Sequence, residues 1–152
     1  MTAVGNRQSA VEEERIDSYR DLRVWKEAMG LAVQCYEMIK TFPREEMFGL
    51  VTQIRRAAAS VPANIAEGYG RESTCSYAQF LRTAQGSLKE LETHFLLATR
   101  VDLISEAKSE PLIRQSDVVG RMLRGLIRSI ERSGSIADRR LPTAVTSEGR
   151  ET

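Results

Sequence analysis

The chain has 152 residues, the length of one ordinary domain, and needs neither disulfides nor metal to bury a core. Its 22 Lys and Arg residues nearly balance its 21 Asp and Glu residues, so the net charge gives no argument for a nucleic-acid partner. Two cysteines, Cys35 and Cys75, are too few for a secreted disulfide framework, and no stretch reaches the roughly 20 apolar residues of a membrane span. These features predict a soluble cytoplasmic protein with two buried free thiols.

Residues 1–20 are polar and lack a sustained apolar period, which predicts a flexible N-terminal tail. From Asp21 the pattern becomes that of an amphipathic helix over about residues 23–41. Its apolar positions are Trp25, Ala28, Met29, Ala32, Cys35, Tyr36 and Ile39. Pro43 ends it, because the residue before a proline is disfavoured in helical geometry.

A second helix is predicted over about residues 45–67. Its apolar stripe consists of Met47, Leu50, Ile54, Ala57, Ala58, Val61 and Ile65. Pro62 lies within this stripe and predicts a kink, because it removes one backbone hydrogen bond. Gly68 and Gly70 are expected to supply left-handed backbone geometry at the helix end.

The third and fourth helices are predicted over about residues 73–101 and 109–133. The third has the clearest repeat, at Tyr77, Leu81, Ala84, Leu88, Leu91, Phe95 and Ala98. Ser105 or Ser109 caps the fourth. A start at Ser109 puts Pro111 in the first turn, where its missing N–H costs little, whereas a start at Ser105 demands a distortion. Residues 134–152 are expected to form a flexible C-terminal tail.

Four amphipathic helices with short connectors predict an all-α fold, an antiparallel up-down-up-down four-helix bundle over residues 21–133. A short connector can only return the chain alongside the preceding helix. No strand pattern competes with this prediction.

Residues that could support catalysis are few. His94 is the only histidine, so the chain cannot supply the two Glu-x-x-His helices of a di-metal bundle. Neither cysteine has a base evident in the sequence, and Gly68-x-Gly70 ends a helix where phosphate-binding glycines would follow a strand. We therefore predict no enzyme activity, no catalytic residue, no metal site and no cofactor.

The fourth predicted helix carries a basic face. Five arginines fall within an arc of about 80° opposite the apolar stripe, at about 100° per residue: Arg114, Arg121, Arg124, Arg128 and Arg132. A charged face of this kind is most often simply solvated. Alternatively, it contacts successive phosphates of RNA or DNA, or an acidic protein partner.

The second predicted helix carries small apolar residues, Ala59, Ala63 and Ala66, outside its core stripe. Close approach by a second subunit would explain them, although alanine is also simply the best helix former. We expect these alanines, with the polar residues Arg55, Arg56, Asn64 and Glu67, to form oligomer or bundle contacts.

The runs Asp21–Trp25, Gln53–Ala58, Val61–Gly68 and Gly86–Glu92 resemble the four helix bundle proteins, also called 23S ribosomal RNA intervening sequence proteins. The resemblance covers roughly residues 21–133. It implies a left-handed bundle that assembles as a homopentamer. It also implies similarity to the accessory protein of diversity-generating retroelements, a pentameric bundle that binds nucleic acid and a reverse transcriptase. No assigned catalytic residue follows from it.

From residues and resemblance together, we expect a non-enzymatic, oligomeric bundle that acts as a nucleic-acid-binding or scaffold module through its fourth helix. The alternative is a protein-interaction adaptor with no nucleic-acid role.

Overall fold

The computed structural model describes the backbone of residues 15–140 and the side chains of residues 15–134. The described residues form four α-helices and two short 3₁₀ helices, with no strand among them, which confirms the predicted all-α class. In chain order the elements are η1 (Tyr19–Asp21), α1 (Arg23–Ile39), η2 (Arg44–Glu46), α2 (Leu50–Tyr69), α3 (Thr74–Arg100) and α4 (Glu106–Arg140). Residues 1–14 and 141–152 of the predicted flexible tails lie outside the described part of the chain.

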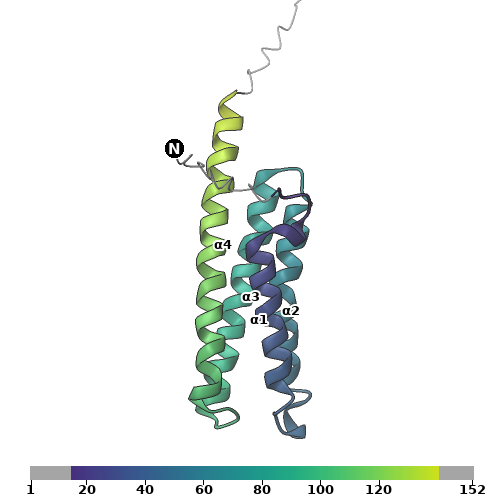
Figure 1. Ribbon diagram of the computed structural model, residues 1–152, viewed down its shortest axis with the longest axis vertical. Helices are drawn as coiled ribbons and strands as arrows, with labels where there is room; N and C mark the ends of the chain where they lie inside the picture. The colour runs from purple at the N-terminus through teal and green to yellow at the C-terminus, as the bar shows by residue number, and fades with distance from the viewer. Residues whose placement is uncertain (1–14, 141–152) are drawn as a thin grey trace, which may run out of the picture.

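The four α-helices form one elongated bundle (Figure 1). Their connectors alternate between the two ends of the bundle, so the chain runs in opposite directions along consecutive helices. Contacts join α1 to α2, α2 to α3, α3 to α4 and α4 back to α1. Each helix therefore buries one stripe against two neighbours, which is the packing expected when four amphipathic helices share one core. The left-handed twist stays a prediction.

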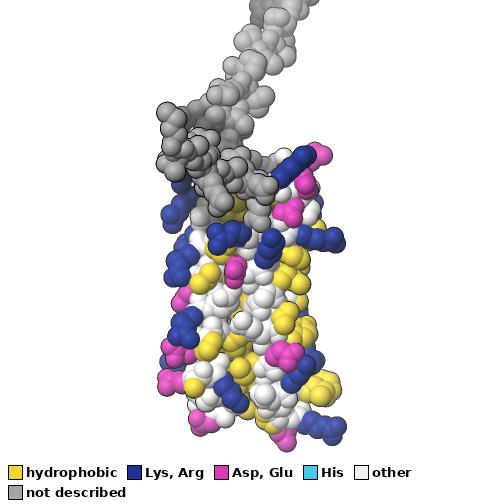
Figure 2. All heavy atoms as spheres, in the orientation of Figure 1, with side chains coloured by type: hydrophobic (Ala, Val, Ile, Leu, Met, Phe, Trp, Pro, Cys, Tyr) yellow, Lys and Arg dark blue, Asp and Glu magenta, His cyan; other side chains and the backbone are white. Residues whose placement is uncertain are grey.

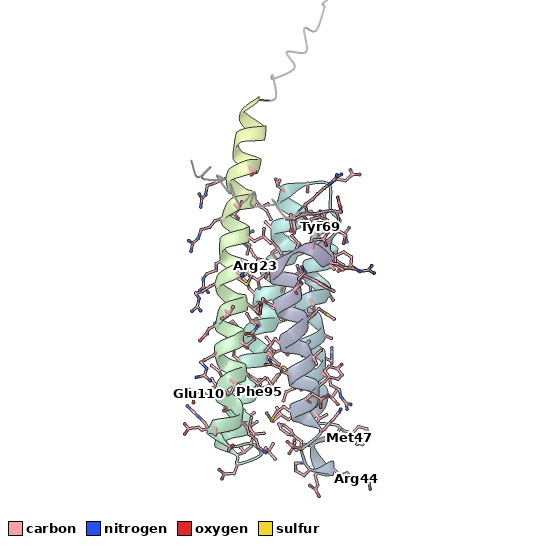
Figure 3. The ribbon with its side chains drawn as sticks, viewed as in Figure 1. Arg23, Arg44, Met47, Tyr69, Phe95 and Glu110 are labelled. Carbon is pink, nitrogen blue, oxygen red and sulfur yellow. The ribbon has the colours of Figure 1, made fainter. Side chains whose placement is uncertain are left out.

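Large apolar side chains from all four helices fill the centre of the bundle. Leu31, Ile54, Phe95 and Leu123 are among the largest that are fully buried. Phe95 points inward from α3 in Figure 3. Burial of each such side chain contributes about 1.5–3 kcal/mol to the free energy of folding, so this shared core is the main source of stability.

Three residues predicted for the core stripes, Met29, Tyr36 and Met47, are exposed instead. Met29 and Tyr36 lie on the outer edge of the apolar arc of α1, which is wider than the part that packs inward. Met47 precedes α2, because the chain first forms η2 and then breaks at Gly49, whose φ of −106° and ψ of −110° are not helical. The predicted start of the second helix at residue 45 was therefore wrong.

The end of α2 also differs from prediction. Pro62 lies inside α2, which continues through it to Tyr69. Gly70 has a φ of −78°, and no glycine among the described residues has a positive φ, so the predicted left-handed end was wrong. Gly68 has a packing role instead. A Cβ there would lie 2.9 Å from Phe80 Cβ and 2.9 Å from Tyr77 Cδ2, so its absence lets α3 approach α2.

The helix α3 matches its prediction to within one residue at each end. Ser73 caps it by accepting a hydrogen bond from the Ser76 N–H (3.1 Å).

The helix α4 is longer than predicted, and the predicted start at residue 109 was wrong. Ser105 is its cap and accepts a hydrogen bond from the Lys108 N–H (3.3 Å). Pro111 lies within the helix at an exposed position, where one backbone hydrogen bond is lost without breaking the helix. The backbone also stays helical over residues 134–140, which had been assigned to the C-terminal tail.

The last part of the predicted N-terminal tail is folded onto the bundle. The Asp21 carboxylate accepts hydrogen bonds from the Asp17 and Ser18 N–H groups (2.9 and 3.1 Å), and these bonds lower its pKa. Tyr19 packs edge-to-face on Trp25, with ring centroids 5.3 Å apart. The ordered chain therefore begins before the predicted boundary at residue 21.

Candidate nucleic-acid interface and apolar groove

The basic face of α4 is exposed to solvent along its length. All five arginines of the sequence prediction, Arg114, Arg121, Arg124, Arg128 and Arg132, are exposed. Figure 2 shows dark-blue side chains one above another over α4, along the left edge of the molecule. They point away from the bundle because α4 turns its apolar stripe toward α1 and α3.

The five arginines are not equivalent. Arg114 forms an ion pair with Glu110 at 3.2 Å, and Asp117 falls in the same arc, about 40° from Arg121 at 100° per residue. Glu110 lies at the outer edge of α4 near its first turns in Figure 3. The lower part of the face is therefore mixed in charge, a feature that the sequence prediction had not weighed.

The upper part of the face is more strongly basic. Within residues 15–134, where side chains are described, no carboxylate pairs with Arg121, Arg124, Arg128 or Arg132. The next acid along the helix, Glu131, forms an ion pair with Arg82 of α3. Because Arg82 neutralises Glu131, the potential around the four arginines stays positive. We call Arg121, Arg124, Arg128 and Arg132 the basic stripe; it spans about 16 Å at 1.5 Å per residue.

The predicted contact residues of α2 lie on its outer surface or at the partly buried edge of the helix. Arg55, Arg56, Ala59, Ala63 and Glu67 are exposed, and Ala66 is half-buried. The Arg55 guanidinium lies over the Tyr36 ring of α1, 6.0 Å from its centroid, so this residue is engaged with its own bundle.

Asn64 belongs to a polar link between α2 and α3. Its Nδ2 donates hydrogen bonds to the backbone oxygen and to Oγ of Ser60 (2.8 and 2.9 Å). The Ser60 hydroxyl lies 2.7 Å from the Ser87 hydroxyl of α3. Asn64 therefore holds the Ser60 hydroxyl, which itself makes the contact with α3.

An apolar groove of about 540 Å³ runs along the outer surface between α1 and α2. Figure 2 shows yellow side chains gathered over these helices, on the right of the molecule. The residues that line the groove are Tyr19, Trp25, Met29, Ala32, Val33, Tyr36, Glu37, Ala59, Pro62, Ala63 and Ala66. The structure thus brings the three alanines of α2 together with an apolar wall from α1.

The sequence prediction missed this wall. The helical period of α1 predicts core positions for Met29 and Tyr36 and assigns no role to Val33. The signal was present, because the apolar residues of α1 cover about 220° of its circumference at 100° per residue, far more than one bundle core needs.

The described residues offer little for catalysis. Burial raises the pKa of the Cys35 thiol to about 12, so this group stays protonated and is a poor nucleophile. Cys75 is exposed, so the expectation that both thiols are buried was wrong for Cys75, which lies near the end of the bundle in the first turn of α3. His94 Nε2 lies 3.6 Å from the Glu90 carboxylate on the same helix. No group of three or more potential metal ligands occurs within the described residues.

None of the helices that the structure describes combines the length and the apolar character that a bilayer span requires.

Comparison with known proteins agrees with this architecture. The family model of the 23S rRNA-intervening sequence protein matches residues 20–125. The chain belongs to this family. The resemblance carried by the sequence runs around Ile54 and Gly68 is thereby confirmed. No curated protein matches the chain.

A solved structure from Bacteroides thetaiotaomicron VPI-5482 is similar to the chain. It is described as a protein with unknown function from the S23 ribosomal protein family. It shares 25% sequence identity and has a TM-score of 0.65, over 68% of this chain and 97% of that chain. The family and the fold are thus established, and neither description states an activity.

Proposed function

We propose that the protein is a non-enzymatic, oligomeric helical bundle that binds nucleic acid through the basic stripe of α4. One observation carries this proposal: four exposed arginines follow one another on one helix, and no described carboxylate forms an ion pair with them.

Phosphate chemistry explains why this arrangement suits nucleic acid. Successive arginines of the stripe are three or four residues apart, which places them about 4.5–6 Å apart along the helix axis. Guanidinium groups bind phosphate oxygens through two parallel hydrogen bonds, and each neutralised phosphate releases a counterion. A straight row of such groups follows a sugar-phosphate backbone.

Recognition through this stripe depends on backbone shape and charge more than on base sequence. The stripe contains no aromatic residue that could stack on an unpaired base. Its helix also presents all four arginines within an arc of about 80°, which suits a regular duplex.

The experiment compares two triple variants in binding to a DNA duplex of about 20 base pairs over a series of salt concentrations. Replacement of Arg121, Arg124 and Arg128 by Ala should reduce the slope of log K against log salt by about 2.7, since each lost phosphate contact contributes about 0.9. The control replaces Lys26, Lys40 and Lys108 by Ala, which removes the same charge from exposed positions outside the stripe.

Circular dichroism should show equal helicity for both variants, because all six side chains are exposed. Equal losses of affinity in both variants would show a general effect of charge and contradict a site on α4. Unchanged binding by the stripe variant would also contradict it. Absence of binding by the unmodified protein, together with recovery of a stoichiometric protein partner after nuclease treatment, would favour the adaptor instead.

A further inference from the structure

Two apolar features of the surface have no partner among residues 15–134, whose side chains the structure describes. One is the apolar groove between α1 and α2, and the other is Phe48, in the connector between η2 and α2. Neither feature overlaps the basic stripe. No residue of α4 lines the groove, and Phe48 lies between η2 and α2.

The groove has the form of a socket for a large apolar side chain. Ala59 and Ala63 contribute only methyl groups from α2, while Trp25, Met29 and Val33 rise from α1. Val33 is 57% exposed although it is β-branched and wholly apolar. Leaving such a contiguous apolar surface in water is unfavourable, and surfaces of this kind usually mark contact sites.

Phe48 has the form of the matching knob. Its side chain is 93% exposed, so it packs against almost nothing in the described part of the chain. Its neighbour Met47 is 45% exposed and lies at the tip of the bundle in Figure 3, beyond the end of α1. An exposed phenylalanine of this kind resembles the aromatic anchors that dominate protein interfaces.

Hydrogen bonds hold the turn that carries Phe48 on both sides of this residue. The Gly49 N–H donates a hydrogen bond to the Glu46 oxygen (3.1 Å), and the Thr52 hydroxyl donates one to the Met47 oxygen (2.7 Å). The Glu46 carboxylate accepts a further bond from the Leu50 N–H (3.4 Å). These bonds hold the backbone on both sides of Phe48, so little backbone entropy is lost when the ring becomes buried.

We propose that Phe48 of one copy of the chain inserts into the apolar groove of a second copy. Each copy of the chain then carries one Phe48 side chain and one groove that can receive it. The contact is compatible with a closed ring, with an open chain of subunits, and with a twofold dimer in which each copy inserts Phe48 into the groove of the other. This inference deepens the oligomeric part of the proposed function and is independent of nucleic-acid binding.

Complementation between two variants tests the contact. Phe48→Glu removes the knob and keeps the groove, whereas Val33→Glu blocks the groove and keeps the knob. Each variant alone should be monomeric by light scattering at concentrations where the unmodified protein is oligomeric. An equimolar mixture should form a 1:1 heterodimer, because one intact knob and one intact groove remain.

The control is Leu96→Glu, which introduces the same charge at an exposed apolar position of α3. It should leave the oligomer unchanged, and urea titrations should show that all three variants remain folded. If Phe48→Glu remains oligomeric, the proposed contact is wrong, although the protein is still an oligomer. A mixture that stays monomeric would overturn the contact as well. A monomeric unmodified protein would contradict both the contact and the oligomeric part of the proposed function, whereas nucleic-acid binding is measured separately.

Discussion

The basic stripe of α4 and the apolar groove of α1 and α2 present opposite chemistries to solvent. Arg121 and its neighbours are already well solvated, so the fold does not require a partner there. Val33 and Tyr36 lie in an apolar hollow where exposure to water costs free energy. The groove therefore makes the stronger case that something covers it, while the stripe makes the stronger case for the chemistry of its ligand.

The two regions are also separate in the bundle. The groove is lined by η1, α1 and α2, whereas the stripe belongs to α4 alone. Assembly through the groove would leave one basic stripe exposed on every subunit. The oligomer would then bind a long polyanion through several weak sites at once.

The largest expected effect on nucleic-acid affinity comes from a variant that prevents assembly through the groove and keeps the basic stripe. On a long duplex that spans several subunits, Val33→Glu should weaken binding by about 10²-fold, because the linked sites become independent. On a duplex of about 10 base pairs, roughly 34 Å long at 3.4 Å per base pair, one subunit suffices and the change should be small. Replacement of Arg121, Arg124 and Arg128 by Ala should weaken binding to both duplexes. Equal effects of Val33→Glu on the two lengths, measured by fluorescence anisotropy, would contradict the separation.

Two glycine substitutions compare the stability effect of an added methyl group at a packed position with its effect at an exposed position of the bundle. Gly68→Ala should lower the free energy of unfolding by about 1–3 kcal/mol, because its new methyl group meets Phe80 and Tyr77 at 2.9 Å. Gly125→Ala, on the exposed side of α4, meets nothing within 4 Å and should raise stability by up to about 1 kcal/mol.

Urea unfolding of both glycine variants measures these changes. Nucleic-acid binding by Gly125→Ala should stay within about twofold of the unmodified protein, since all four arginines remain in place. A destabilised Gly125→Ala would show that the outer face of α4 is packed against another surface.

The smallest expected effect concerns the ion pair beside the stripe. Arg82→Ala leaves the Glu131 carboxylate unneutralised near Arg128 and Arg132, so binding should weaken a few-fold. Stability should change by less than about 1 kcal/mol, because both side chains are about half exposed.

The matched control is Lys40→Ala. It removes an equal charge from the exposed ion pair of Lys40 with Glu37, near the C-terminal end of α1. It should affect binding less than Arg82→Ala does. If the two variants weaken binding equally, neutralisation of Glu131 is not what keeps the stripe basic.

The elements differ in how well local sequence patterns predict them. The helix α3 was predicted almost to the residue, because its apolar repeat is uninterrupted and Ser73 can satisfy the first free N–H groups. The start of α2 was misplaced, because Met47 continues the helical period although Gly49 interrupts the backbone. The start of α4 depended on the choice between Ser105 and Ser109, and a proline at an exposed position did not exclude the longer helix.

The candidate sites also differ in how well the sequence predicts them. The five arginines of α4 could be assigned to one face, because helical periodicity fixes which residues share a side. Periodicity could not reveal that Arg82 neutralises Glu131, since these residues come from different helices. The groove was half predicted: the alanines of α2 stood out, whereas Met29 and Tyr36 were assigned to the core.

The sequence by itself determined the helical class, the family and the side of α4 on which the arginines lie, since these follow from local periodicity and short residue runs. Only the tertiary structure decided which part of each apolar arc is buried. Periodicity gives the direction of a side chain around its own helix, and burial depends on where the neighbouring helices stand. That choice separates the core at Phe95 from the groove at Val33 and leaves Phe48 exposed at the tip of the bundle.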